Sequence, residues 1–175
     1  MRVSSIIRIT SVYLLVSALI CLFYLAIAIL KYDLNSINSW VSIAFPGLVI
    51  GVAIFNNIDI LTFRKIERTL RQKLNINGII CAIQVLSFST DDFLYQYVQG
   101  IRLVLIASFD HSTKNVSFGR AFDPMVLDFE ILFSSSNYTS IGVNLIPLSI
   151  AVFSFLWGRK YKEMVPKKAK RENTT

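Results

Sequence analysis

The sequence predicts an all-α membrane protein built as a four-helix transmembrane bundle, and three observations carry that prediction. The chain of 175 residues is 54% hydrophobic but only 17% charged, whereas ordinary soluble domains have about 25% charged residues. The apolar residues fall in long blocks rather than alternating with polar ones, as in helices that have lipid for a solvent. The basic residues gather in short segments between these blocks, which is typical of cytoplasmic loops.

The first two blocks predict a tight hairpin of membrane-crossing helices, at about residues 9–30 and 40–60. Residues 9–30 carry no charge between Arg8 and Lys31. At about 1.5 Å per residue, this block is long enough to cross a hydrocarbon layer of roughly 30 Å. It is also longer than the apolar core of a cleavable signal peptide, about 7–15 residues, so we expect an uncleaved helix.

Two alternatives remain open for the third crossing. Residues 76–90 are uncharged but short, whereas residues 93–109 contain Arg102, which would cost about 2.5–3.5 kcal/mol at mid-bilayer. We therefore favour 76–90 as the third helix and 138–157 as the fourth. The segment 91–137 between them is predicted to be a small extramembrane subdomain that can include a β-hairpin, because apolar and charged residues alternate near its end.

The charge distribution predicts that the N- and C-termini are both cytoplasmic. The formal net charge is +7, and the basic residues lie near the N-terminus, in a loop at 64–73 and in a tail at 165–175 that we expect to be disordered. The extracytoplasmic segment 91–137 holds more acidic than basic residues. Four crossings therefore put all three basic segments on the side of the membrane that favours them.

This pattern predicts a multi-pass integral membrane protein that faces anionic lipid headgroups, with a bacterial inner membrane favoured. A basic chain can also bind nucleic acid, but the basic segments here carry no interleaved aromatic residues on which bases would stack. We therefore expect no nucleic-acid partner.

Two features inside the predicted helices point to helix packing or to buried polar contacts. Gly47 and Gly51 form a G-x-x-x-G spacing, which lets another helix approach closely, either the first span or a second copy in a homo-oligomer. Asn56, Asp59 and Asn144 are candidate intramembrane polar residues, and ionisable groups at such depth often mark ion or proton paths. Because Asp59 lies close to the basic loop, a solvated membrane boundary also explains it.

Residues that could carry chemistry are sparse. His111 is the only histidine, and both cysteines, Cys21 and Cys81, fall inside apolar blocks, so neither a His-rich metal site nor an external disulfide framework is expected. Walker, dinucleotide-binding and G-x-S-x-G motifs are missing from the sequence. We therefore expect no cofactor and no catalytic or metal site. An enzyme that uses Asp91, Asp92 or His111 is the least favoured alternative.

These observations favour a non-enzymatic membrane protein that acts by binding another membrane protein. Immunity, exclusion and accessory subunits act in this way. Immunity proteins against pore-forming bacteriocins and plasmid exclusion proteins also include basic inner-membrane chains of similar size, a likeness of topology that rests on no shared motif. The alternative is a small transporter or channel subunit, suggested by Asp59, Asn144 and the prolines at 46 and 147. Tetraspanins share the layout, but their Cys-Cys-Gly signature is missing here, which excludes that family.

Overall fold

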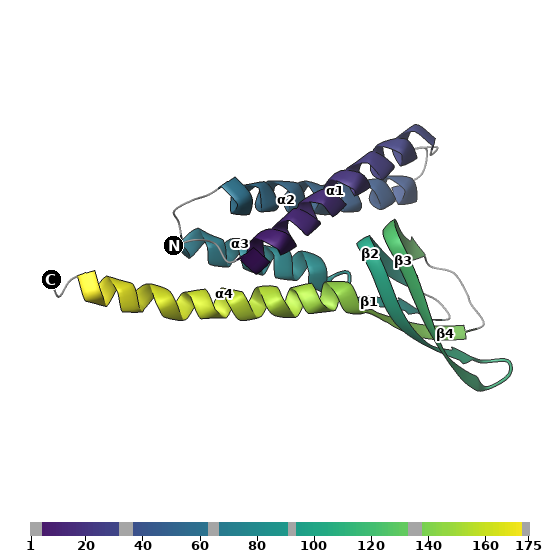
Figure 1. Cartoon of the computed structure of the whole chain (residues 1–175). Helices are drawn as coiled ribbons and strands as arrows, with labels where there is room; N and C mark the ends of the chain where they lie inside the picture. The colour runs from purple at the N-terminus through teal and green to yellow at the C-terminus, as the bar shows by residue number, and fades with distance from the viewer. Residues whose placement is uncertain (1–4, 32–36, 63–66, 91–93, 133–137, 173–175) are drawn as a thin grey trace.

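The computed structural model describes residues 5–31, 37–62, 67–90, 94–132 and 138–172. In chain order, the described elements are α1 (Ser5–Lys31), α2 (Ile37–Thr62), α3 (Glu67–Ala82), β1 (Leu86–Ser89), β2 (Leu94–Asp110), β3 (Asn115–Leu132), β4 (Tyr138–Asn144) and α4 (Leu145–Glu172). The helices lie side by side at one end of the molecule, and the strands form a sheet at the other end (Figure 1).

The predicted all-α four-helix transmembrane bundle is wrong. Within the residues that the structure describes, only α1 and α2 are long and apolar enough to cross a membrane, over Ser5–Leu30 and Ile43–Thr62. The other two predicted spans are each divided between helix and strand: 76–90 leaves its helix after Ala82 and enters β1, and 138–157 begins as β4. Both divided segments change there to alternating polar and apolar residues, a pattern that favours a strand.

The four strands form one antiparallel sheet in the order β1-β4-β2-β3. β2 and β3 pair along almost their whole length, from Leu94 opposite Leu132 to Asp110 opposite Asn115. β1 pairs with β4 and also with the start of β2. The hairpin that the sequence suggested within 91–137 is therefore one part of a larger sheet, which also takes in strands from two predicted helices.

A bulge interrupts the β2–β3 pairing close to the helices. Gly100 stands opposite Val126 and Arg102 opposite Asp123, so two residues of β3, Pro124 and Met125, face the single residue between Gly100 and Arg102. Proline has no N–H to give to a ladder and is accommodated at such positions. Gly100 has a φ of 99°, a conformation that glycine adopts without the steric cost of a Cβ.

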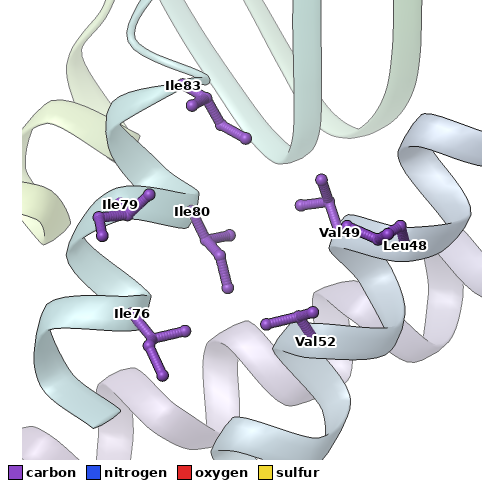
Figure 2. A pocket seen from close by; sticks show the side chains of 7 residues that line it. All are labelled: Leu48, Val49, Val52, Ile76, Ile79, Ile80 and Ile83. Atoms are coloured by element: carbon purple, nitrogen blue, oxygen red, sulfur yellow. The ribbon is translucent and has the colours of Figure 1, made fainter. Parts of the chain in front are cut away.

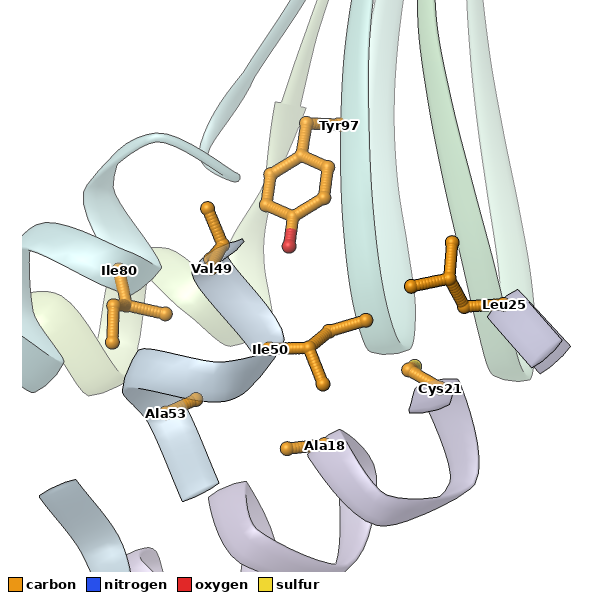
Figure 3. Packing of buried hydrophobic residues seen from close by; sticks show 8 residues of the cluster. All are labelled: Ala18, Cys21, Leu25, Val49, Ile50, Ala53, Ile80 and Tyr97. Carbon is orange, nitrogen blue, oxygen red and sulfur yellow. The ribbon is translucent and has the colours of Figure 1, made fainter. Parts of the chain in front are cut away.

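The elements that pack against α1 to form the hydrophobic core differ between its two ends. Near its N-terminal end, side chains from all four helices meet in a cluster made by Ile7, Ile60, Leu70, Leu74, Phe153 and Trp157. Towards its C-terminal end, α1 and α2 pack instead against the sheet, in a cluster whose buried members include Ala18, Cys21, Leu25, Val49, Ile50 and Tyr97 (Figure 3). One half of the molecule is therefore a four-helix bundle, and in the other half a sheet replaces α3 and α4.

Helix α1 is apolar on all sides, yet only one stripe of it is covered. The buried positions repeat at spacings of four and three residues, the seam expected of packed helices: Ile7, Ser11, Leu14, Ala18, Cys21 and Leu25. Large apolar side chains on its other faces are exposed, among them Ile9, Val12, Val16, Leu19 and Phe23. A helix that is apolar all round is normally buried in a protein or in lipid.

Two predicted polar segments also differ from expectation. Residues 67–73 of the predicted loop at 64–73 belong to α3, and the rest of that loop lies outside the described residues. Helix α4 continues to Glu172, so most of the tail at 165–175 is helical rather than disordered.

Candidate functional site

A cluster of buried asparagines joins α2 to α3, and we call Asn56, Asn57 and Asn77 the asparagine cluster. Their exposed fractions are 6%, 0% and 1%. The side-chain oxygen of Asn77 accepts hydrogen bonds from Asn56 Nδ2 at 2.7 Å and from Asn57 Nδ2 at 3.2 Å. In return, Asn77 Nδ2 donates to Asn57 Oδ1 at 2.9 Å. The three side chains thus satisfy one another by hydrogen bonds, which buried polar groups need to offset their lost hydration.

Heptad spacing in α2 explains why two of these residues are buried. Its buried positions are Pro46, Val49, Ile50, Ala53, Asn56, Asn57 and Ile60, so Asn56 and Asn57 follow Val49 and Ile50 by seven residues each. The asparagines therefore replace apolar residues in a core seam. Backbone carbonyls satisfy their remaining donors, because Asn56 Nδ2 also donates to Lys73 O and Asn57 Nδ2 to Ala53 O.

Asp59 and Lys73 form an ion pair at the edge of the asparagine cluster. Their side chains are 44% and 19% exposed, respectively. The sequence grouped Asp59 with Asn56, and the structure keeps both at the α2–α3 contact. Since Asp59 is already paired with a lysine, it does not present an isolated charge along this contact.

Asn144, the third predicted intramembrane polar residue, lies elsewhere, at the junction of β4 and α4. Its Oδ1 accepts from Leu103 N at 3.1 Å, and its backbone N donates to Val85 O at 2.7 Å. Asn144 therefore ties three segments of backbone together. It does not share a polar path with Asp59.

The two glycines of the G-x-x-x-G spacing have different surroundings. A Cβ added to Gly47 would lie 3.4 Å from a methyl group of Leu25 in α1, whereas one added to Gly51 would meet no atom within 4 Å. Gly47 thus serves the contact between the two long helices. Gly51 borders open space.

The contact between the β-bulge and α1 could not be foreseen from any motif in the sequence. The hydroxyl of Tyr13 accepts a hydrogen bond from Ile101 N at 3.1 Å, and a Cβ on Gly100 would lie 2.9 Å from that hydroxyl and 3.0 Å from Ser17 Oγ. One helical turn beyond Ser17, the Cys21 thiol approaches Val126 O at 3.8 Å. Strands β2 and β3 therefore cross α1 near its middle.

Charged side chains lie on the sheet close to this crossing. The guanidinium of Arg102 contacts the carboxylate of Asp123 at 2.7 Å and that of Asp128 at 3.8 Å, and Gln96 donates to Asp128. The two carboxylate side chains are each 38% exposed. Arg102 therefore belongs to a strand and has partners, which explains why its segment does not behave as a membrane helix.

One face of the sheet is exposed and mostly apolar, with Arg120 opposite Leu105 as a charged residue on it. Residues directly opposite one another on paired strands point to the same side, and the register aligns Phe109 with Val116 and Ala107 with both Phe118 and Ile141. The exposed large apolar side chains on this side, here called the apolar sheet face, are Leu86, Leu105, Phe109, Val116, Phe118, Phe122 and Ile141. Phe118 is the most open of them, at 83%.

The residues considered for chemistry are scattered. His111 Nε2 lies 2.9 Å from Thr139 Oγ1, at the exposed end of the hairpin, and Asp91 and Asp92 lie outside the described residues. Cys21 and Cys81 are both buried free thiols. In the part of the chain that the structure describes, no three His, Cys, Asp or Glu side chains gather where they could hold a metal ion.

No known protein family, no curated protein and no solved structure matches this chain.

Proposed function

We propose that this chain is a membrane-anchored binding protein, whose helices α1 and α2 cross a bilayer and whose sheet binds another membrane protein. The anchor is supported by the length and composition of the two helices. It is also supported by the exposed apolar side chains of α1, which lipid would cover at a gain of about 25 cal/mol per Å².

The charges support a cytoplasmic location for both termini. Arg8, Arg71 and Arg159 all lie at the end of the molecule where the four helices meet, beyond or beside the cluster of Ile7 and Ile60. Positive charges favour the cytoplasmic side of a membrane. With this orientation α1 and α2 cross twice, and the sheet lies towards the outer half of the membrane and beyond it.

The observation that carries the binding role is the apolar sheet face beside an open strand edge. Among the described strands, β3 pairs only with β2, which leaves its other edge without a neighbour. Exposed apolar patches mark interaction surfaces, and unpaired backbone groups are costly in hydrocarbon. A protein partner covers the apolar side chains and can also hydrogen-bond to the edge, as in strand addition.

The Arg102 cluster adds a second argument for a protein partner. It lies where the strands cross the middle of α1, so in a bilayer its charges are near membrane depth. A charged side chain exposed to lipid there costs about 2.5–3.5 kcal/mol on insertion scales. Arg102 pairs with Asp123 and the adjacent Leu103 with Phe122, so the cluster lies on the face opposite the apolar sheet face, and protein packed over that opposite face avoids the cost. Accessory subunits and immunity-type proteins act by binding another membrane protein in this manner.

Photo-crosslinking in native membranes tests this proposal. A photoreactive amino acid at Phe118 is expected to give a discrete adduct with a second integral membrane protein, identified by mass spectrometry. Placed at Leu22, an exposed position of α1, the same group is expected to label lipid. The adduct should disappear when Val116→Asp is added on the same face. Labelling of lipid alone from position 118 would refute the proposal, and a self-adduct would indicate a homo-oligomer instead.

No observation favours the transporter or channel alternative. The predicted polar residues divide between two places, with Asp59 paired to Lys73 and Asn144 tied to strand backbone. An enzyme that uses His111 lacks support in the same way, because this ring lies beside Thr139 Oγ1 at the exposed end of the hairpin.

A further inference from the structure

A pocket of about 370 Å³ lies between α3 and α4 and combines two cations with an apolar floor. It is lined by Arg71, Asn75 and Ile79 of α3 and by Phe155 and Arg159 of α4. The residues from α3 are spaced four apart and those from α4 are also four apart, so each helix presents one stripe to the pocket. The ion pairs among the described residues involve neither arginine.

Close helix packing brings the two arginines to the same pocket. A Cβ on Gly158 would lie 2.7 Å from Asn75 Oδ1, and a Cβ on Gly78 would lie 2.8 Å from two ring atoms of Phe155. Only glycine fits at these two contacts without a shift of the neighbouring side chain. The short distance between the helices therefore depends on the two glycines.

An apolar groove on the neighbouring side of α3 shares one lining residue, Ile79, with this pocket. The groove has a volume of about 230 Å³ and lies between α2 and α3, lined by Leu48, Val49, Val52, Ile76, Ile79, Ile80 and Ile83. Ile76 and Ile80 face α2 across it, and Ile79 lies on the side of α3 away from α2 (Figure 2). Ile79 lines both spaces, so the basic pocket and the apolar groove border one another along the surface of α3.

We propose that this paired site binds one anionic phospholipid, with its phosphate between Arg71 and Arg159 and one acyl chain in the α2–α3 groove. Guanidinium groups bind phosphate oxygens through charge-assisted hydrogen bonds, and basic pockets between membrane helices on the cytoplasmic side bind anionic headgroups. The groove suits an acyl chain because every lining side chain is aliphatic. Its volume exceeds the roughly 150 Å³ of an apolar cavity that accepts benzene.

The dimensions and the direction agree with a lipid of the cytoplasmic leaflet. Ile83 follows directly after the last residue of α3 and lies twelve residues beyond Arg71, or about 18 Å along the helix axis. This is close to half of a roughly 30 Å hydrocarbon layer plus its interface. The basic end lies where the positive-inside rule puts the cytoplasm. This inference rests on the proposed membrane anchoring, but it does not depend on the protein partner.

The test compares lipid binding by the full-length chain and by charge variants in a mild neutral detergent. Native mass spectrometry gives the affinity for phosphatidylglycerol and for phosphatidylcholine with the same chains. We expect the wild type to prefer phosphatidylglycerol, and Arg71→Gln/Arg159→Gln to bind it at least about tenfold more weakly. The matched control is Lys114→Gln/Arg120→Gln, which removes two exposed charges from the hairpin and is expected to bind as the wild type does.

Two further variants distinguish lipid binding from simple anion binding and from misfolding. Val52→Trp fills the groove and leaves both arginines in place, so it should weaken phosphatidylglycerol binding while leaving the binding of inorganic phosphate unchanged. Arg71→Lys/Arg159→Lys keeps the charges and is expected to retain most of the affinity, which guards against a folding defect in the glutamine variant.

Three results would overturn the lipid site: equal affinity of wild type and the Arg71→Gln/Arg159→Gln variant, an equal loss in the hairpin control, or full competition by inorganic phosphate. Alkaline carbonate extraction of the same proteins tests the anchoring separately. If the chain resists extraction but binds both lipids equally, the anchoring proposal stands and the lipid site is refuted. If the chain is extracted, the anchoring proposal is refuted.

Discussion

Replacement of Asn77 with alanine removes the centre of the asparagine cluster. The wild-type side chain makes three hydrogen bonds to Asn56 and Asn57, at 2.7, 3.2 and 2.9 Å. After the replacement, Asn56 Nδ2 still has Lys73 O and Asn57 Nδ2 still has Ala53 O. The atom left without its described donor is Asn57 Oδ1, in a side chain that is fully buried.

The free energy of unfolding should fall by about 2–3 kcal/mol. Interhelical hydrogen bonds in membrane proteins contribute about 0.6 kcal/mol each, so three of them give about 2 kcal/mol. One buried acceptor without a donor adds about 1 kcal/mol or more. Asn57→Ala/Asn77→Ala removes that acceptor as well, and the two hydrogen bonds between Asn57 and Asn77 are lost in either single variant. The double variant should therefore cost about 2 kcal/mol less than the sum of the two single variants.

Denaturant unfolding in detergent micelles, followed by far-ultraviolet circular dichroism, measures these differences. Gln72→Ala is the matched control on α3, because Gln72 is exposed, and its effect should stay within about 0.5 kcal/mol. A loss below about 0.5 kcal/mol for Asn77→Ala, or strict additivity in the double variant, would show that the three asparagines do not act as one hydrogen-bonded unit.

Three further predictions follow from the backbone and the glycines. Gly100→Ala should destabilise by about 3 kcal/mol, from backbone strain and from crowding against Tyr13, whereas Gly119→Ala, with no atom within 4 Å of its added Cβ, should be neutral in the same unfolding assay. Gly51→Leu should leave stability unchanged and Gly47→Leu should lower it; loss of chemically crosslinked dimers in Gly51→Leu would assign that open position to a homo-oligomer contact. Lys114→Gly should stabilise the hairpin by about 0.5–1 kcal/mol, because Lys114 has a φ of 56°, and a lower melting temperature would contradict this.

The hairpin turn also has a pH dependence of known sign. Hydrogen bonds from the backbone N–H groups of Ser112 and Thr113 hold the pKa of the Asp110 carboxyl below its ordinary value of 3.8. A carboxyl with a lowered pKa stabilises the folded turn above its ordinary pKa, and this contribution is lost as the pH falls through the lowered value. The amide NMR shifts of both residues should therefore stay constant at neutral pH and move only below about 3.8. Movement near pH 5 would contradict the assignment.

Sequence reasoning was sufficient where a long apolar run had no competing pattern. The helices predicted at 9–30 and 40–60 lie inside α1 and α2, because twenty or more apolar residues favour one conformation in lipid. It failed at 76–90 and 138–157, which are uncharged but contain several Asn, Gln, Ser and Thr residues. In β1, apolar and polar residues alternate, with Ser87 and Ser89 following Leu86 and Phe88, and this alternation favours a strand. The prediction gave more weight to the lack of charge than to this alternation.

The charge argument contributed to the same error. Keeping the basic tail at the cytoplasmic side requires an even number of crossings, and two crossings satisfy that condition as well as four do. Asn77 was overlooked for a related reason: inside a supposed lipid-facing span it is one polar residue among many apolar ones. Its importance appears only when α3 packs on α2 and brings it to Asn56 and Asn57.

The junction of helices and sheet explains how α3 can end, and α4 can begin, within the length covered by α1. A helix that ends away from water leaves backbone carbonyls without donors, which is costly in hydrocarbon. Here the chain passes into strands almost at once, and Val85 O accepts from Asn144 N at 2.7 Å. The side-chain oxygen of Gln84 adds a further hydrogen bond between the end of α3 and the sheet, because it accepts from Gln99 N of β2 at 2.9 Å. The sheet therefore takes over the backbone hydrogen bonding where α3 ends and α4 begins, so in the proposed membrane arrangement neither helix has to reach the far side.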